Sequence, residues 1–290
     1  MPEERQTKNQ RREAAREAAR LEREKQKRRD RMRRWLIPTV STLAVLAIAA
    51  GIVWAFVSNQ PAPQSAAGPR NMISDGILFT ADDTGAVVPV ETGAIPPSGS
   101  PTPTDPQDDG LAHIVTYVDF SCPACKSFEE AYATSIDALV AAGVATLEVH
   151  PIAILDRLYL GTRYSSRANN AGACVADLAP QSFLDVMAAF FANQPAEGTS
   201  GLTDAEMIDL VHGTGLVDED VDACIEDELF GPWIIATTER ASSDPDLVVP
   251  GNPGLVTPTI VVNGDVWDSQ SGIDAMDFIQ SHITATPGED

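Results

Sequence analysis

Two cysteines, Cys122 and Cys125, lie between a strand-like segment and a helical one in DFSCPACKSF, and this placement leaves few folds open. The run 113–119 before them is mostly apolar and rich in β-formers, as a buried central strand would be. Pro123 suits the first turn of a helix, where its missing N–H costs nothing. The pattern after it predicts a helix to about residue 142. The cysteine pair is therefore expected where a central strand passes into a helix.

A Cys-x-x-Cys pair at a helix N-terminus is electrostatically suited to redox chemistry. Unpaired backbone N–H groups and the positive end of the helix dipole lower the pKa of a thiol such as Cys122, and the thiolate is the reactive species. Cys125, one turn further on, is expected on the same side but deeper. A structural disulfide is an alternative, although it would close almost no loop and add little stability. A metal clip is another, but it needs about four ligands, and the remaining cysteines and the histidines are scattered.

The rest of the chain predicts one sheet with helices on both sides. Asn263–Gly264 is a typical type I′ hairpin turn between two short strands near the C-terminus. An amphipathic helix follows this hairpin. The other predicted elements are strands near 76–80, 86–90 and 144–151, a Pro-rich loop at 95–110, and a block of helices between 163 and 243.

The run DFSCPACKSF, the helical block and VTPTIVVNG together resemble the DsbA-like branch of the thioredoxin superfamily, over about residues 71–283. The resemblance implies a thioredoxin fold (α/β) with an inserted helical domain at about 155–245, and thiol–disulfide oxidoreductase activity. In that family a Thr-Pro bond is cis and lies against the active-site sulfurs. Carried over, Pro258 would be cis and Thr257 would present backbone groups to a substrate strand, with Pro123 and Ala124 on the same substrate-binding surface. A trans proline at the start of a strand is the alternative.

Two positions depart from the pattern of that family. Strongly oxidising relatives have His before the second cysteine, where this chain has Ala124. Relatives often carry a buried acid six residues before the first cysteine, thought to accept the proton of the second thiol, and here that position is Thr116. Asp119 is nearer in sequence, but we expect a solvated strand-end carboxylate rather than a proton acceptor. These departures leave the direction and strength of oxidation open.

Cys174 and Cys224 both fall in the helical block, in AGACVAD and DACIEDE. Two buried thiols tend to pair in an oxidising compartment, so we expect a structural disulfide between them. The closed loop of about 50 residues would stabilise the fold by about 4 kcal/mol. Two separate buried thiols are the alternative.

The N-terminal part of the chain predicts a membrane anchor. Residues 1–34 carry 14 Lys/Arg and 7 Asp/Glu, whereas the remainder carries 6 and 35. Residues 35–57 are uncharged and long enough to cross a hydrocarbon core about 30 Å thick as a helix. The excess of positive charge before this transmembrane helix predicts a cytoplasmic N-terminus, with a Pro/Ala-rich linker at 58–70 and an extracytoplasmic domain at 71–290. A cleaved signal peptide is the alternative.

Taken together, these features predict an oxidase that forms disulfides in secreted or surface proteins. Cys122 would form the mixed disulfide with the substrate, and Cys125 would close the internal bond. No cofactor is required, since both electrons reside on sulfur. The resemblance implies re-oxidation by a quinone-linked membrane partner, such as one of the vitamin-K-epoxide-reductase type. A reductase, and a non-catalytic binding module or copper carrier, are the alternatives. The acidic body argues against nucleic-acid binding.

Overall fold

The computed structural model describes residues 67–104 and 110–283. The predicted basic tail and transmembrane helix, and most of the predicted linker, lie outside the described residues. Within the two described ranges, no helix combines the length and the apolar character that a membrane crossing requires.

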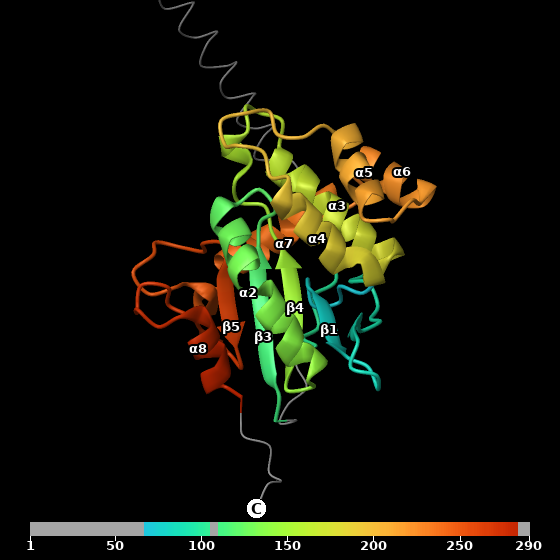
Figure 1. The fold of residues 1–290 in the computed structure, drawn as a ribbon. Helices are drawn as coiled ribbons and strands as arrows, with labels where there is room; N and C mark the ends of the chain where they lie inside the picture. Colours follow the sequence, from blue (N-terminus) through green and yellow to red (C-terminus); the bar gives the residue numbers. More distant parts are fainter. Residues whose placement is uncertain (1–66, 105–109, 284–290) are drawn as a thin grey trace, which may run out of the picture. The chain divides into compact units, whose positions relative to one another are not determined.

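A six-stranded sheet, in the order β2-β1-β4-β3-β5-β6, forms the centre of the described part of the chain (Figure 1). Strands β3 and β4 run parallel to each other, and the other neighbouring pairs are antiparallel. The strands span Ile77–Ala81 (β1), Val87–Pro89 (β2), Ala112–Val118 (β3), Ala145–Pro151 (β4), Thr259–Val262 (β5) and Asp265–Val266 (β6).

The two central strands are joined by helix α2, which spans Pro123–Ala141. Parallel neighbours need a crossover connection, and α2 supplies it. Every residue of β4 is buried, while β3 alternates between buried and half-buried side chains. The sequence prediction of a buried central strand that leads into a helix is therefore correct.

Helices cover both faces of the sheet, as predicted. On one face, α2 buries Phe128, Ile136 and Val140, and α8 (Ala275–Ser281) adds Ile279 to the same apolar cluster. On the other face, a smaller cluster joins β3 and β5 to the end of α7 and to the segment that follows α7. Alternate side chains of β3 therefore pack into two separate apolar cores, one on each face of the sheet.

Between β4 and β5 the chain is helical, and helix α3 lies at the centre of this segment. Almost every residue of α3 is buried, because α4, α6 and α7 pack around it. A helix enclosed in this way is buried on all sides rather than on one stripe. The helices are α3 (Tyr164–Leu178), α4 (Phe183–Ala192), α5 (Asp204–Gly213), α6 (Glu219–Glu226) and α7 (Gly231–Ser243), with short 3-10 turns at Asp156–Leu158, Pro180–Ser182 and Pro245–Leu247.

The predicted hairpin near the C-terminus joins β5 to β6. Asn263 and Gly264 both have positive φ, 52° and 87°. A type I′ turn needs this conformation at both central residues, which is why Asn-Gly is favoured there. The turn pairs β6 with β5, and β5 in turn pairs antiparallel with β3, the strand that leads to the cysteine pair.

Candidate active site

The two cysteines of Cys-Pro-Ala-Cys occupy the first turn of α2. Cys122 is the N-cap residue, Pro123 is the first helical residue, and Cys125 lies one turn inward. Both thiols are free; Cys122 is 6% exposed and Cys125 is 1% exposed. Pro123 and Ala124, between them, are exposed. The start of α2 therefore places Cys122, which is slightly more exposed than Cys125, beside two exposed residues.

The two thiols have opposite electrostatic environments. The hydrogen bond from Cys125 lowers the pKa of Cys122 to about 6 against the opposing effect of burial, and Thr257 and the backbone N–H groups of Cys125 and Ala124 contribute further. Burial raises the pKa of Cys125 well above its ordinary value, and the hydrogen bond and charge of Cys122 raise it further. At neutral pH the pair is thus a Cys122 thiolate beside a Cys125 thiol.

The loop before β5 lies directly against Cys122. The Thr257–Pro258 peptide bond is cis, and Cys122 Sγ lies 3.3 Å from the carbonyl oxygen of Thr257. Strand β5 begins at the next residue, Thr259, and pairs with β3. The sheet register therefore brings together Cys122, Thr257 and Pro258, although 135 residues separate Cys122 from Thr257.

The prediction that Asp119 is a solvated strand-end carboxylate is wrong. Asp119 is fully buried. One carboxylate oxygen accepts hydrogen bonds from the N–H and hydroxyl of Ser121 and from Asn169, and the other accepts from the N–H groups of Ile154 and Leu155 and from Ser165. Burial raises the pKa of Asp119, and the bonds from Ser165 and Ser121 lower it. The physical reason is the packing of α3 and the loop after β4 over the end of β3.

Two side chains that no sequence motif marks hold the loop before α2 in place. Gln194, just after α4, donates to the carbonyl oxygens of Phe120 (2.9 Å) and Cys122 (3.0 Å). The Tyr159 hydroxyl donates to the carbonyl oxygen of Ser121 at 3.0 Å. Both residues come from the helical segment and lie far from the cysteines in sequence. This segment therefore orients the active-site loop.

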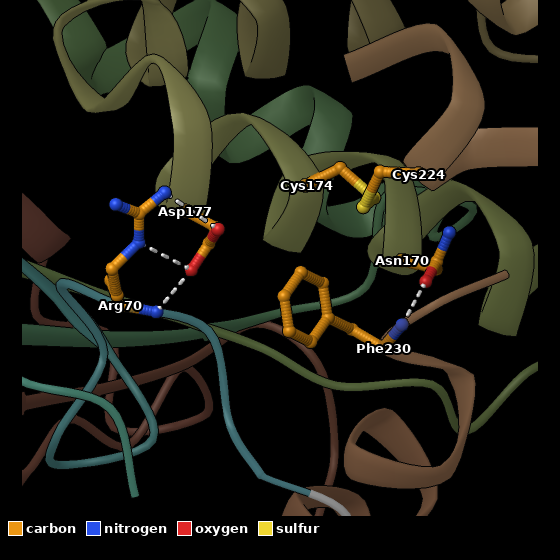
Figure 2. Close-up of a disulfide and its surroundings, with 6 residues drawn as sticks. All are labelled: Arg70, Asn170, Cys174, Asp177, Cys224 and Phe230. Atoms are coloured by element: carbon orange, nitrogen blue, oxygen red, sulfur yellow. Dashed lines mark hydrogen bonds and ion pairs between the residues drawn. A yellow bond between two sulfur atoms is a disulfide. The ribbon is translucent and has the colours of Figure 1, made fainter. Parts of the chain in front are cut away.

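Cys174 and Cys224 form a disulfide that joins α3 to α6 (Figure 2). Arg70 pairs with Asp177 of α3 at 3.0 Å, and Asn170 of α3 accepts a hydrogen bond from the N–H of Phe230 at 2.8 Å. These contacts join α3 to the N-terminal segment and to the start of α7. The disulfide is thus part of the scaffold around α3 and separate from the Cys122–Cys125 pair.

Nothing in the described ranges suggests a metal centre. No group of three or more His, Cys, Asp or Glu side chains among these residues is arranged to hold a metal ion.

Comparison with known proteins gives a family and several structural relatives. The thioredoxin family model matches residues 107–280. Reduced DsbA from Mycobacterium tuberculosis is similar with a TM-score of 0.53 and 26% identity, over 73% of this chain and 94% of that chain. Oxidised BdbD from Bacillus subtilis has the same fold, with a TM-score of 0.50 and 17% identity over 76% of this chain and 98% of that chain.

A third structural relative is MdbA from Corynebacterium diphtheriae, described as a thiol-disulfide oxidoreductase. Its TM-score is 0.50 and its identity 18%, over 70% of this chain and 93% of that chain.

A comparison with curated protein sequences gives no match. The family model covers more than half of the chain, and the matched residues include the cysteine pair, the cis-proline and the whole of the helical segment. The chain therefore belongs to the thioredoxin family, and DsbA-type proteins are among its structural relatives.

Proposed function

We propose that the chain is a thiol–disulfide oxidoreductase that acts as an oxidase on the thiols of secreted or surface proteins. The observation that carries the proposal is the asymmetry of the cysteine pair. Cys122, at the N-terminus of α2, has a pKa of about 6, whereas burial keeps Cys125 in the thiol form. A sulfur that is stable as a thiolate is a good leaving group as well as a nucleophile. One structural relative, MdbA from Corynebacterium diphtheriae, is described as a thiol-disulfide oxidoreductase, which supports the same activity.

The reaction follows from the position of each sulfur. A substrate thiolate attacks Cys122 in the Cys122–Cys125 disulfide, and Cys125 leaves with the electron pair of the broken bond. A second substrate thiolate then attacks the substrate sulfur of the mixed disulfide and releases Cys122 as a thiolate. The substrate loses two electrons, and the cysteine pair gains them. The backbone of Thr257, beside Cys122, would align the substrate as a short strand.

The oxidase direction is supported by the ionisation of Cys122. With a pKa of about 6, ionisation at pH 7 stabilises the reduced pair by about 1.4 kcal/mol relative to a thiol of ordinary pKa. For a two-electron couple this makes the disulfide about 30 mV more oxidising. The pKa of about 6 for Cys122 also supports a second candidate function, that of a reductase. This pKa lies nearer to the value of about 7 for the reactive cysteine of thioredoxin than to the value of about 3.5 for that of DsbA.

The compartment and the redox partner are part of the proposal. We propose that residues 35–57 anchor the chain with its N-terminus in the cytoplasm and residues 71–290 outside. The Cys174–Cys224 disulfide supports an oxidising compartment. An oxidase there needs an acceptor for the two electrons, and a quinone-linked membrane protein, such as one of the vitamin-K-epoxide-reductase type, would serve.

Two measurements on the full-length protein test the proposal. The first is the redox equilibrium of the cysteine pair with glutathione: a potential between about −120 and −180 mV supports an oxidase, and one near about −270 mV supports a reductase. A value below about −300 mV would indicate a structural bond and overturn the enzymatic proposal. The second is trapping: Cys125→Ser is expected to accumulate mixed disulfides through Cys122, and Cys122→Ser is expected to form none there.

A further inference from the structure

Side chains of the helical segment hold the loop that carries Cys122 at three consecutive carbonyl groups. The side-chain amide of Gln194 donates to the carbonyl oxygens of Phe120 (2.9 Å) and Cys122 (3.0 Å). The hydroxyl of Tyr159 donates to the carbonyl oxygen of Ser121 at 3.0 Å. A peptide group is planar, so a donor that holds its carbonyl also fixes the rotation of the whole group. The helical segment therefore fixes three peptide groups in a row, the last of which joins Cys122 to the first residue of α2.

Gln194 is the one donor to the Phe120 carbonyl oxygen among the described residues. Phe120 is fully buried, and a buried carbonyl group without a donor is unfavourable. Without the Gln194 amide, this peptide group would turn toward another donor or toward water. Cys122 follows two residues later, and its carbonyl oxygen shares the same amide nitrogen. Gln194 thus joins the loop to the start of α2 through a single nitrogen atom.

The reactivity of Cys122 depends on the position of its sulfur relative to the donors around it. The hydrogen bond from Cys125 is the largest cause that holds the pKa of Cys122 at about 6, and Thr257 and the backbone N–H groups of Cys125 and Ala124 add to it. Hydrogen bonds weaken steeply when their distance or angle departs from the optimum. A rotation of the peptide groups beside Cys122 would move its Sγ relative to these donors. The thiolate would then lose stabilisation although every donor is still present.

We propose that Gln194 is a positioning residue for thiol–disulfide exchange, which holds the loop before α2 so that the Cys122 sulfur stays within reach of its donors. This inference rests on the proposed function. In the first step a substrate thiolate bonds to the Cys122 sulfur, and Cys125 leaves with the electron pair of the broken bond. In the second step a substrate thiolate attacks the substrate sulfur, and Cys122 leaves with the electron pair. Gln194 acts on the second step most directly, because negative charge develops on Cys122 there.

Gln194→Met in the full-length protein tests this role, with Asn193→Leu as the matched control. Each change replaces an amide with an apolar side chain of similar size. Asn193 precedes Gln194 in the same loop, and its amide donates to the carbonyl oxygen of Ala189 in α4 at 2.9 Å. The first measurement is the pKa of Cys122, from the rate at which the reduced protein is alkylated as a function of pH. The second is the redox equilibrium of the cysteine pair with glutathione, at about pH 5 and about pH 7.

We expect Gln194→Met to raise the pKa of Cys122 by about 1 from its value of about 6. A higher pKa disfavours the thiolate, and with it the reduced pair that carries the thiolate. The glutathione equilibrium should therefore shift toward the Cys122–Cys125 disulfide by about 5-fold near pH 7. Near pH 5 it should barely shift, because Cys122 is protonated in both proteins. Asn193→Leu should match the unmodified protein in both measurements.

Gln194→Asn is a second and milder test. Asparagine keeps the amide but is one methylene group shorter, so it cannot keep both hydrogen bonds at their present lengths. We expect it to raise the pKa of Cys122 in the same direction by a smaller amount. If the methionine variant fails to fold, the asparagine variant decides, and an unchanged pKa in it would overturn the inference.

Two results with a folded Gln194→Met protein would also overturn the inference. One is a pKa of Cys122 equal to that in Asn193→Leu. The other is a shift of the glutathione equilibrium that is the same at both pH values, which would indicate a structural role for Gln194. Both leave the proposed function intact as long as Cys125→Ser still traps mixed disulfides, whereas failure of trapping would refute the proposed function itself.

Discussion

The pKa of Cys122 should depend more on the hydrogen bond from the Cys125 thiol than on the electrostatic effect of the N-terminus of helix α2. Its ordinary value of 9.0 falls to about 6 in the structure, and the hydrogen bond from Cys125 is the largest cause. A hydrogen bond to a charged group contributes about 1.5–3 kcal/mol, whereas a helix terminus contributes about 0.3–1 kcal/mol at an exposed site. At about 1.4 kcal/mol for each pH unit, removal of the Cys125 donor should raise the pKa of Cys122 by about 1 to 2.

The perturbation is Cys125→Ala, and Cys125→Ser is the matched control because its hydroxyl still donates. We expect a pKa of about 7–8 for Cys122 in the alanine variant and a value near 6 in the serine variant. The assay follows the ultraviolet absorbance of the thiolate, and separately the rate of alkylation by iodoacetamide, between about pH 4 and pH 9. Cys174 and Cys224 are joined to each other, so Cys122 is the one titrating thiol in both variants.

Equal pKa values for Cys122 in the two variants would contradict this expectation. A shared value near 6 would mean that the backbone N–H groups of α2 and Thr257 stabilise the thiolate without Cys125. A shared value near 9 would mean that the serine hydroxyl does not reach Cys122, and in that case the alkylation rate of the unmodified reduced protein decides whether the native pKa is low. Circular dichroism of both variants controls for a change of fold.

Three further predictions concern stability. The folded state lowers the pKa of Cys122 from 9.0 to about 6. As the pH rises from about 6 to about 9, the free energy of unfolding of the reduced protein should therefore increase relative to that of the oxidised protein, by up to ~4 kcal/mol. Denaturant titrations of both forms measure this difference. Replacing both Cys174 and Cys224 with Ala should destabilise the fold by about 4 kcal/mol in the same assay, since their disulfide closes a loop of 50 residues; a loss below about 1 kcal/mol would contradict this. Burial raises the pKa of Glu148, but His150, Ser74 and Thr104 outweigh it and lower the value to about 2. Stability of about 3 kcal/mol should therefore be lost as the pH falls from about 4.5 to about 2, and an unchanged acid transition in Glu148→Gln would refute this.

Several elements could be predicted from the sequence because their causes are local. The apolar run of β3, the proline at the start of α2 and the two cysteines one turn apart lie within one short segment. The Asn263–Gly264 turn needs positive φ at two adjacent residues, and few residue pairs allow that. The order of strands and helices followed from such local signals, and with it the α/β class.

The environment of Asp119 shows where local reasoning stops. Its six donors belong to the loop after β3, the segment after β4 and helix α3, up to 50 residues away. Alternation along a strand does not say whether a residue just past its end meets water or another element. The prediction of a solvated carboxylate failed because α3 packs over that end of the sheet, and nothing near Asp119 in sequence records this packing.

The sequence by itself determined the chemistry of this protein: two thiols at the start of a helix, a second pair of cysteines in the helical block, and a Thr-Pro pair before a short strand. Only the tertiary structure decided how these groups act on one another. The pairing of β5 with β3 brought Thr257 to Cys122, and the packing of α2 against the sheet and α4 buried Cys125. The pKa of a thiol depends on burial and on neighbours within a few ångströms, and these are properties of the folded chain.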